Sequence, residues 1–265
     1  MGNYPAQIVW KPDRNKRHPV LSTSDRQYRA LLRDLSTSNV ELATRVDVDT
    51  SKGETVREEK IPKTVKDALR VFFFDAQHLG PPCVVASLFS IVAWRVNLST
   101  PIGILDGFCF VAAIVFWWFQ EHVMHDKLLH SKIDWYGRKV HEAHHKKPYF
   151  HISIDPAPLI LGWLLCAHLT LSFLLPKPLA LSATLGYAGA GLFYEWSHFI
   201  VHTKVRFRPG FWKHMKSHHI RHHCIDSRYW LGFSVPAIDD LFGTNPTVQQ
   251  IRKQTLDQDG DQTRL

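Results

Sequence analysis

The stretch 125-HDKLLHSKIDWYGRKVHEAHH-145 carries five histidines and directly follows a long apolar run. A second set of five follows another apolar run, between residues 198 and 223. Ten of the seventeen histidines therefore fall into four clusters. These clusters are His125 with His130, then His141, His144 and His145, then His198 with His202, and finally His219, His222 and His223. Positions i, i+3 and i+4 share one face of a helix, so each triple cluster predicts three imidazoles converging on one point.

The first cluster needs a special backbone, because residues five apart do not share a face of a regular α-helix. We therefore expect a helix end or a local bulge between His125 and His130. Neutral imidazole is the commonest protein ligand of transition metals. Ten imidazoles exceed the need of one ion and of a tetrahedral structural zinc site, which indicates two ions with about five ligands each. The alternative is a surface histidine tract that binds metal loosely, but such tracts do not show two matched halves.

Composition limits the remaining possibilities. The chain has 265 residues, is 45% hydrophobic and carries a net charge of +8, which suits one sizeable domain. We expect no nucleic-acid partner, because no basic helix or aromatic–basic module accompanies the positive charge. The four cysteines form no Cys-x-x-Cys pair and no framework of a secreted protein.

The chain divides by polarity into three parts. Residues 1–64 form a polar, partly disordered arm with one short helix expected at 24–35. Residues 65–247 form the main domain, and residues 248–265 form a polar tail. The domain begins with an amphipathic stretch at 65–79, which fits either a helix in the membrane interface or an ordinary packed helix.

Four apolar segments predict an all-α integral membrane protein with about four transmembrane helices. They cover residues 81–98, 102–119, 157–175 and 179–200. About 20 apolar residues cross a bilayer, so the last three segments fit and the first, interrupted by Arg95, is marginal. A soluble all-α core is the alternative, but it does not explain three long runs that are almost free of charge.

The distribution of Lys and Arg predicts the orientation. There are 14 before the first segment, 6 in the 121–156 loop and 10 after residue 200, against only Arg95 and Lys177 in the two other loops. Positive charge favours the cytosolic side, so both termini and the long loop are expected there. This topology brings all four histidine clusters to one membrane face, within a cytosolic helical cap that holds the dinuclear histidine site.

Together, the four clusters resemble those of the fatty acid hydroxylase/sterol desaturase superfamily of membrane oxygenases. The similarity covers roughly residues 80–247 and is nearest to the fatty acid 2-hydroxylase branch. Two further patterns support it: Tyr194-Glu195-x2-His198, and Gly232-Phe233-x5-Asp239-x2-Phe242-Gly243-Thr244. No His-Pro-Gly-Gly stands in the arm, so we expect that the cytochrome b5 domain fused to some 2-hydroxylases is absent.

The resemblance implies a dinuclear non-haem centre, with two iron ions that zinc can replace, which activates O2. It implies hydroxylation of a lipid acyl chain, on a fatty acid or a sphingolipid. Electrons would come from cytochrome b5 or a similar external donor. It also implies a multi-pass protein of the endoplasmic reticulum, and no catalytic residue beyond the metal ligands. The alternatives are oxidation or desaturation of a sterol or carotenoid by the same centre, and a membrane protein that binds metal without turnover.

Some neighbouring residues are candidates for supporting roles. A shift of helix register would let His122 or His218 replace one of the ten ligands. A ligating histidine usually donates its other ring nitrogen to a carboxylate or carbonyl. The acidic residues that could accept such a bond are Glu121, Asp126, Glu195, Asp226 and Asp239.

Overall fold

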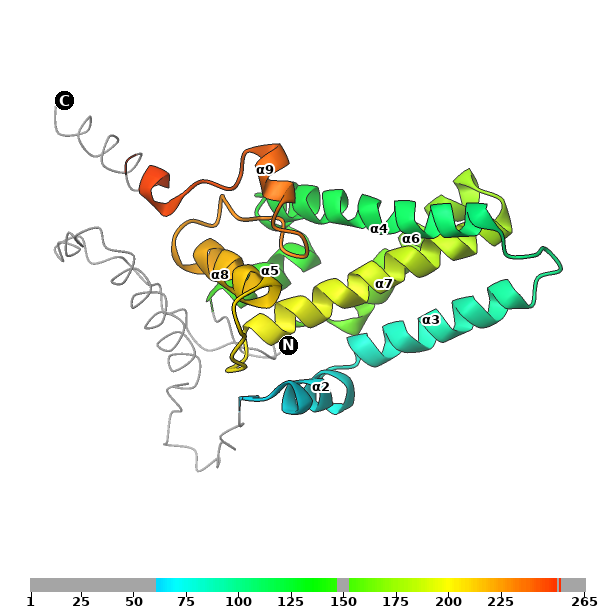
Figure 1. The fold of residues 1–265 in the computed structure, drawn as a ribbon, viewed down its shortest axis with the longest axis horizontal. Coiled ribbons are helices and arrows are strands. Elements are labelled where there is room, and N and C mark those ends of the chain that lie inside the picture. The colour runs from blue at the N-terminus through cyan, green and yellow to red at the C-terminus, as the bar shows by residue number, and fades with distance from the viewer. Residues whose placement is uncertain (1–60, 147–152, 252, 254–265) are drawn as a thin grey trace.

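A computed structural model describes residues 61–146, 153–251 and 253 of the chain, and every regular element in these ranges is helical (Figure 1). This confirms the all-α class for the described part. The predicted arm up to residue 60, with its helix at 24–35, and residues 254–265 of the tail lie outside the described residues. The elements are α2 (Val65–Phe74), α3 (Gly80–Val96), α4 (Ile104–Met124), the π-helical turn η2 (His125–Leu129), α5 (Tyr136–Lys146), α6 (Ala157–Leu174), α7 (Lys177–Val201), α8 (Phe211–Cys224) and α9 (Ile238–Phe242).

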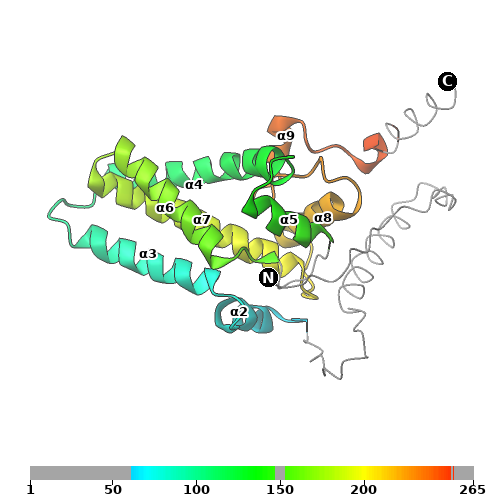
Figure 2. The same ribbon diagram turned by 180° about the vertical axis from the view of Figure 1, so that it is seen from behind.

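The long helices α3, α4, α6 and α7 run alongside one another, while α5, α8 and α9 gather at one end of this bundle (Figures 1 and 2). Prolines lie in the first turns of α3, α6 and α7, where a missing backbone N–H costs nothing. Three of the four long helices therefore begin with a turn that contains proline. The histidine-rich helices α5 and α8 follow the ends of long helices, as the order of apolar runs and clusters predicts.

Arg95, the charge that interrupts the first apolar segment, is buried at the end of α3. Its guanidinium donates to both carboxylate oxygens of Asp106, at 2.7 and 2.9 Å, and to the carbonyls of Thr100 and Pro101. Ser182 of α7 donates to the same carboxylate. The ion pair closes the α3–α4 connection, at the end of the bundle away from α5 and α8 (Figure 1), and leaves neither charge without a partner.

Helices α4 and α7 approach closely because of one glycine. A Cβ atom built at Gly186 would lie 2.2 Å from the backbone oxygen of Phe110. Only glycine therefore fits at this point of α7 without moving α4. Most of α7 is buried, including its small residues Ala180, Ala183 and Ala188, so this helix forms the centre of the bundle.

Two helical segments are long and apolar enough to cross a membrane. One is the continuous helix Ile104–Leu129, of 26 residues, and the other is α6, of 18 residues. Helix α6 has no buried residue, and its Phe173 is 90% exposed. Apolar surface of this extent is unusual in a soluble monomer and suits contact with lipid. The described part therefore contains two candidate membrane helices, and the four-helix topology stays a prediction.

Helix α2 is shorter than the 65–79 stretch suggests. Thr64 caps its start by accepting a hydrogen bond from the N–H of Asp67, and the helix ends at Phe74. Phe72 is fully buried against Trp196 and Phe199 of α7. Val65, Leu69 and Phe74 stay 46, 41 and 84% exposed, so α2 combines a packed face with exposed apolar side chains.

Candidate metal centre

A π-helical turn at the end of α4 resolves the five-residue spacing of the first cluster. The N–H of His130 donates to the carbonyl of His125 at 3.1 Å, which is an i+5 bond. This turn contains one residue more than an α-helical turn, so residues five apart are brought over one another. The two imidazole rings lie 5.0 Å apart. The predicted local bulge is thus confirmed, and its backbone places both rings on one side.

The ten predicted histidines come together in two groups of five. Within each group, one nitrogen from every ring lies within 4.8 Å of all the others. The first group is His125, His130, His141, His145 and His222. The second group is His144, His198, His202, His219 and His223. Each half of the sequence supplies four rings to one group and a single ring, His222 or His144, to the other.

The spacing between ring nitrogens fits metal binding. In the first group, the Nε2 atom of His141 lies 3.1 Å from those of His125 and His130 and 3.0 Å from that of His145. In the second group, the Nε2 atom of His144 lies 2.9 Å from that of His198 and 3.0 Å from that of His223. Two nitrogens bound at right angles to one ion, with bonds of about 2.1 Å, are about 3 Å apart. The donor atoms therefore fit around an ion in each group.

Backbone carbonyls orient two rings of the first group. The Nδ1 atom of His125 lies 2.8 Å from the carbonyl oxygen of Leu231, and that of His222 lies 2.8 Å from the carbonyl oxygen of Tyr229. A carbonyl only accepts, so each Nδ1 carries the hydrogen and each Nε2 turns a lone pair toward the group. No pattern in the sequence predicts these two hydrogen-bond acceptors, because both belong to the backbone.

Burial keeps the rings in the neutral form that a metal requires. In α5 and α8, burial lowers the pKa of His141, His145, His219 and His223, and the neighbouring imidazoles lower it further in each case. The unprotonated form binds metal, so these helices present a ready set of donors at neutral pH.

His122 and His218, the two histidines that a shift of helix register could have made ligands, lie outside both groups. The Nε2 atom of His122 lies 2.8 Å from Oγ1 of Thr244, and that of His218 lies 2.7 Å from a carboxylate oxygen of Asp239. Since Thr244 donates its own hydrogen to Asp239, it accepts from His122. Both Nε2 atoms are therefore protonated donors, which removes them as metal-binding atoms.

The acidic candidates make different bonds from those expected. Glu121 accepts from the N–H of Ser234 at 2.7 Å, and Glu195 accepts from that of Asp155 at 3.0 Å. Asp126 and Asp226 pair with the cations beside them in sequence, Lys127 and Arg228. Asp239 contacts His122 and His218. Two of the ligand rings, those of His125 and His222, bond backbone carbonyls instead.

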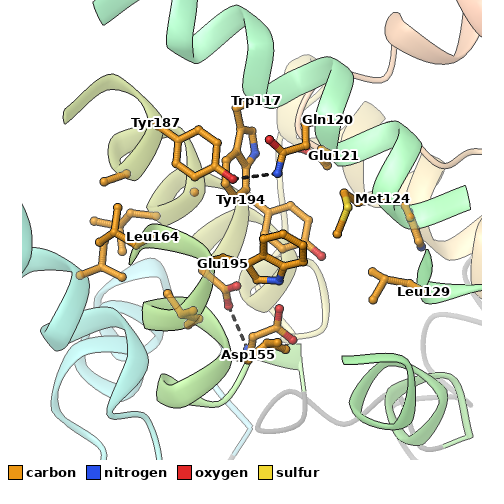
Figure 3. Close-up of a pocket in the computed structure, with 18 of the residues that line it drawn as sticks. Trp117, Gln120, Glu121, Met124, Leu129, Asp155, Leu164, Tyr187, Tyr194 and Glu195 are labelled. Carbon is orange, nitrogen blue, oxygen red and sulfur yellow. Dashed lines mark hydrogen bonds between the residues drawn. The ribbon is translucent and has the colours of Figure 1, made fainter. Parts of the chain in front are cut away.

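An apolar cavity of about 100 Å³ lies beside the first group and has His125 in its wall. Figure 3 shows Trp117, Met124, Leu129 and Leu164 around it. A few polar groups enter this apolar lining. Gln120 donates to the hydroxyl of Tyr187 at 2.7 Å, and the carboxyl groups of Asp155 and Glu195 lie on another side (Figure 3). The cavity can hold an apolar chain next to the histidines.

These features define a class: a helical protein with membrane-length apolar helices and a histidine site for two metal ions, next to an apolar pocket. The fatty acid hydroxylase family profile matches residues 110–244, about half of the chain. The chain belongs to the fatty acid hydroxylase family. This confirms the resemblance seen in the sequence, and it makes the protein an oxidoreductase of the hydroxylase type.

Relatives within the family are identical to this chain at about a quarter of the aligned residues. A dihydroceramide fatty acyl 2-hydroxylase of Arabidopsis thaliana is 26% identical over 178 residues, which cover 62% of this chain and 73% of the plant protein. The fatty acid 2-hydroxylase of Mus musculus is 25% identical over 172 residues, which cover 59% of this chain and 44% of the mouse protein. The hydroxylase branch suggested by the sequence is thus confirmed.

A solved structure shares the fold. Full-length scs7p, of which only the hydroxylase domain is visible, superposes with a TM-score of 0.54 at 18% sequence identity. The match covers 68% of this chain and 70% of that one. The arrangement of helices is therefore that of a known hydroxylase domain.

Proposed function

We propose that this protein hydroxylates the acyl chain of a membrane lipid in an O2-dependent reaction at a centre of two metal ions. The observation that carries the proposal is the convergence of ten imidazoles, six of them buried and four half-buried, in two groups, one of which borders an apolar cavity through His125. His125, His130, His141, His145 and His222 would hold one ion. His144, His198, His202, His219 and His223 would hold the other.

Iron is the metal proposed for the working enzyme, because an imidazole set without thiolate suits it and its redox chemistry would activate O2 when bound. Zinc fits the same nitrogens and can replace it. The electrons are proposed to come from cytochrome b5 or a similar external donor. Family membership and the donor set support this assignment.

The chain's own contribution is to place one C–H bond beside the histidines and to keep water away from it. The side chains of Trp117, Met124 and Leu129 surround the space next to His125. An acyl chain lying there would be held in a fixed direction, and positioning of this kind accounts for a large part of enzymatic rate enhancement. The cavity also leaves little room for bulk water.

The charge of the cavity favours a neutral acyl lipid over a free fatty acid. Three carboxyl groups, those of Glu121, Asp155 and Glu195, belong to its wall, and its described lining contains no Lys or Arg. A fatty acid carboxylate would find no cationic partner in this described lining, whereas an amide N–H or a hydroxyl could donate to the carboxyl oxygens. An N-acylated, hydroxyl-bearing lipid is thus the proposed substrate. The Arabidopsis relative, named as a dihydroceramide fatty acyl 2-hydroxylase, supports this choice over a sterol or carotenoid.

The proposed topology has four transmembrane helices, α3, α4, α6 and α7, in a domain spanning 65–247. The polar arm of residues 1–64 and the tail of residues 248–265 would both lie in the cytosol, as would the cap formed by α5 and α8. The distribution of Lys and Arg supports this orientation. The endoplasmic reticulum is the proposed location, since lipid substrate and electron donor would meet the cap there.

The test is a lipid profile of a host that expresses the chain together with an active cytochrome b5. Wild type should produce acyl lipids heavier by one oxygen atom, and fragmentation should locate the added oxygen on the acyl chain. His222→Ala should abolish the product, while His214→Ala, an exposed position on the same helix, should retain it. Identical profiles for wild type and His222→Ala would favour a protein that binds metal without turnover.

A further inference from the structure

The Gly232–Thr244 pattern around Asp239 contributes to the sequence resemblance but supplies no metal-binding side chain. The Asp239 side chain is completely buried. Its Oδ1 accepts from the N–H of Leu231 at 2.9 Å, and its Oδ2 accepts from the N–H of Gly232 at 2.8 Å and from His218 at 2.7 Å. Thr244 donates to Oδ1 as well. A buried carboxylate with this many donors fixes the backbone around it.

The backbone that Asp239 holds is the segment 229–232, whose carbonyls orient two ligand rings. The carbonyl of Leu231 accepts from His125, and the carbonyl of Tyr229 accepts from His222, each at 2.8 Å. Asp239 therefore accepts from the N–H of the same peptide unit, Leu231–Gly232, whose carbonyl accepts from His125. A shift of this segment would turn both rings at once.

The segment adopts a conformation that needs outside support. Trp230 lies between the two carbonyls and has a φ of 59°. Residues other than glycine seldom adopt this left-handed conformation. Its N–H donates to the carbonyl of Thr244 at 2.8 Å, and the N–H of Thr244 donates to the carbonyl of Asp239 at 2.8 Å. Asp239 and Thr244 thus hold the strained residue from its two sides.

The remaining residues of the pattern complete the same unit. Gly232 packs so closely on Asp239 that a Cβ atom there would lie 3.1 Å from Oδ2. Phe242 stacks on the His122 ring, with ring centroids 4.1 Å apart and planes within 13°. His122 in turn places its Nε2 atom 3.3 Å from Oδ1 of Asp239. These contacts lead to the carboxylate or to the segment that it holds, whereas Phe233 of the pattern packs on the rings of His198 and His219, with centroids 5.4 and 4.5 Å apart.

We propose that Asp239, braced by His122, His218 and Thr244, is a positioning residue that sets the ring orientation of His125 and His222 through the carbonyls of residues 231 and 229. It acts through hydrogen bonds on the first group of histidines, whereas its link to the second group runs through the packing of Phe233 on His198 and His219. This inference rests on the proposed function, in that the two groups bind metal ions.

The test measures the affinity of each group separately for Zn²⁺ on the full-length protein in detergent. His144→Ala breaks the second group and leaves the first as the intact site, whereas His141→Ala does the reverse. Asp239→Asn is then introduced into each background. In the His144→Ala protein it should weaken Zn²⁺ binding about 10- to 100-fold, as loss of an orienting partner typically does. In the His141→Ala protein it should change binding less than about threefold.

Two controls keep the outcome decisive. Asp240→Asn alters the exposed neighbouring carboxylate and should leave both affinities unchanged. Thr244→Val keeps the carboxylate and removes one donor, so it should weaken the same group by a smaller factor if Asp239→Asn fails to fold. Equal weakening of both groups, or none in either, would overturn the proposal. Fewer than two Zn²⁺ ions on the wild-type chain would instead contradict the proposed two-metal centre.

Discussion

The close approach of α4 and α7 gives a stability prediction that can be worked out from one position. Gly186→Ala places a methyl group 2.2 Å from the carbonyl oxygen of Phe110, more than 1 Å inside an ordinary contact. The neighbour is backbone, so the two helices must separate. Overpacking of this kind costs about 1–3 kcal/mol, and the better helix propensity of alanine offsets about 1 kcal/mol. We expect a net loss of up to about 2 kcal/mol.

A second glycine on the same helix provides the matched control. A Cβ atom at Gly189 meets no other atom within 4 Å. Gly189→Ala should therefore gain the propensity term of up to about 1 kcal/mol with no clash. For a domain of this size, 1 kcal/mol shifts the melting temperature by about 2–4 °C, so the two variants should move in opposite directions.

The assay is the apparent melting temperature of the two variants and the wild type in the same detergent, at one heating rate, because unfolding of such proteins is often irreversible. Helix α4 leads into His125 and α7 carries His198, so separation of the helices should also weaken metal binding in Gly186→Ala. If Gly186→Ala melts at or above the temperature of Gly189→Ala, the close packing described for α4 and α7 is wrong.

Three further predictions concern the pocket and the π-helical turn. Burial raises the pKa of Asp155, so its ionisation disfavours the folded state as pH rises. Asp155→Asn should therefore be more stable than wild type by an amount that grows as pH rises from 4 and levels off near neutral pH, which melting curves across pH would reveal. An advantage that shrinks with rising pH would contradict this. Deletion of the exposed Lys127 removes the extra residue of η2 and should withdraw His130 from the first group. The affinity of this group for Zn²⁺ should then fall while the helical circular dichroism signal stays the same. An unchanged affinity would refute the role of the turn. Leu164→Trp fills the side of the cavity opposite Met124 and Leu129 (Figure 3). The hydroxylated products in lipid profiles should therefore shift toward shorter acyl chains. An unaltered chain-length distribution would argue against this cavity as the acyl site.

The sequence predicts the ten clustered histidines and the long helices well, because both depend on local periodicity. Helical spacing brings His219 and His223 to one face, and five-residue spacing at His125 requires the bulge that the π-helical turn provides. The apolar segments agree with α3, α4, α6 and α7 to within a few residues at most ends. Propensity and hydrophobicity decide these features, and neither needs knowledge of distant partners.

The supporting contacts could not be read in the same way. His218 and His222 are four residues apart on one helix, so spacing alone does not separate the ring that bonds Asp239 from the ring that joins the first group. The acceptors for His125 and His222 are backbone carbonyls, which leave no mark in the sequence. In the sequence alone, Arg95 interrupts the first apolar segment, and its ion pair with Asp106 on the next helix becomes apparent only in the structure.

The exchange of one ring between the two groups has a consequence for biogenesis. His222 completes the group otherwise built from residues 125–145, and His144 completes the group otherwise built from residues 198–223. A nascent chain that ends before residue 198 therefore contains four of the five histidines of the first group and only one histidine, His144, of the second. Neither group has its full set of five donors until α8, the last histidine helix, has been synthesised, so the complete site can form only late in translation.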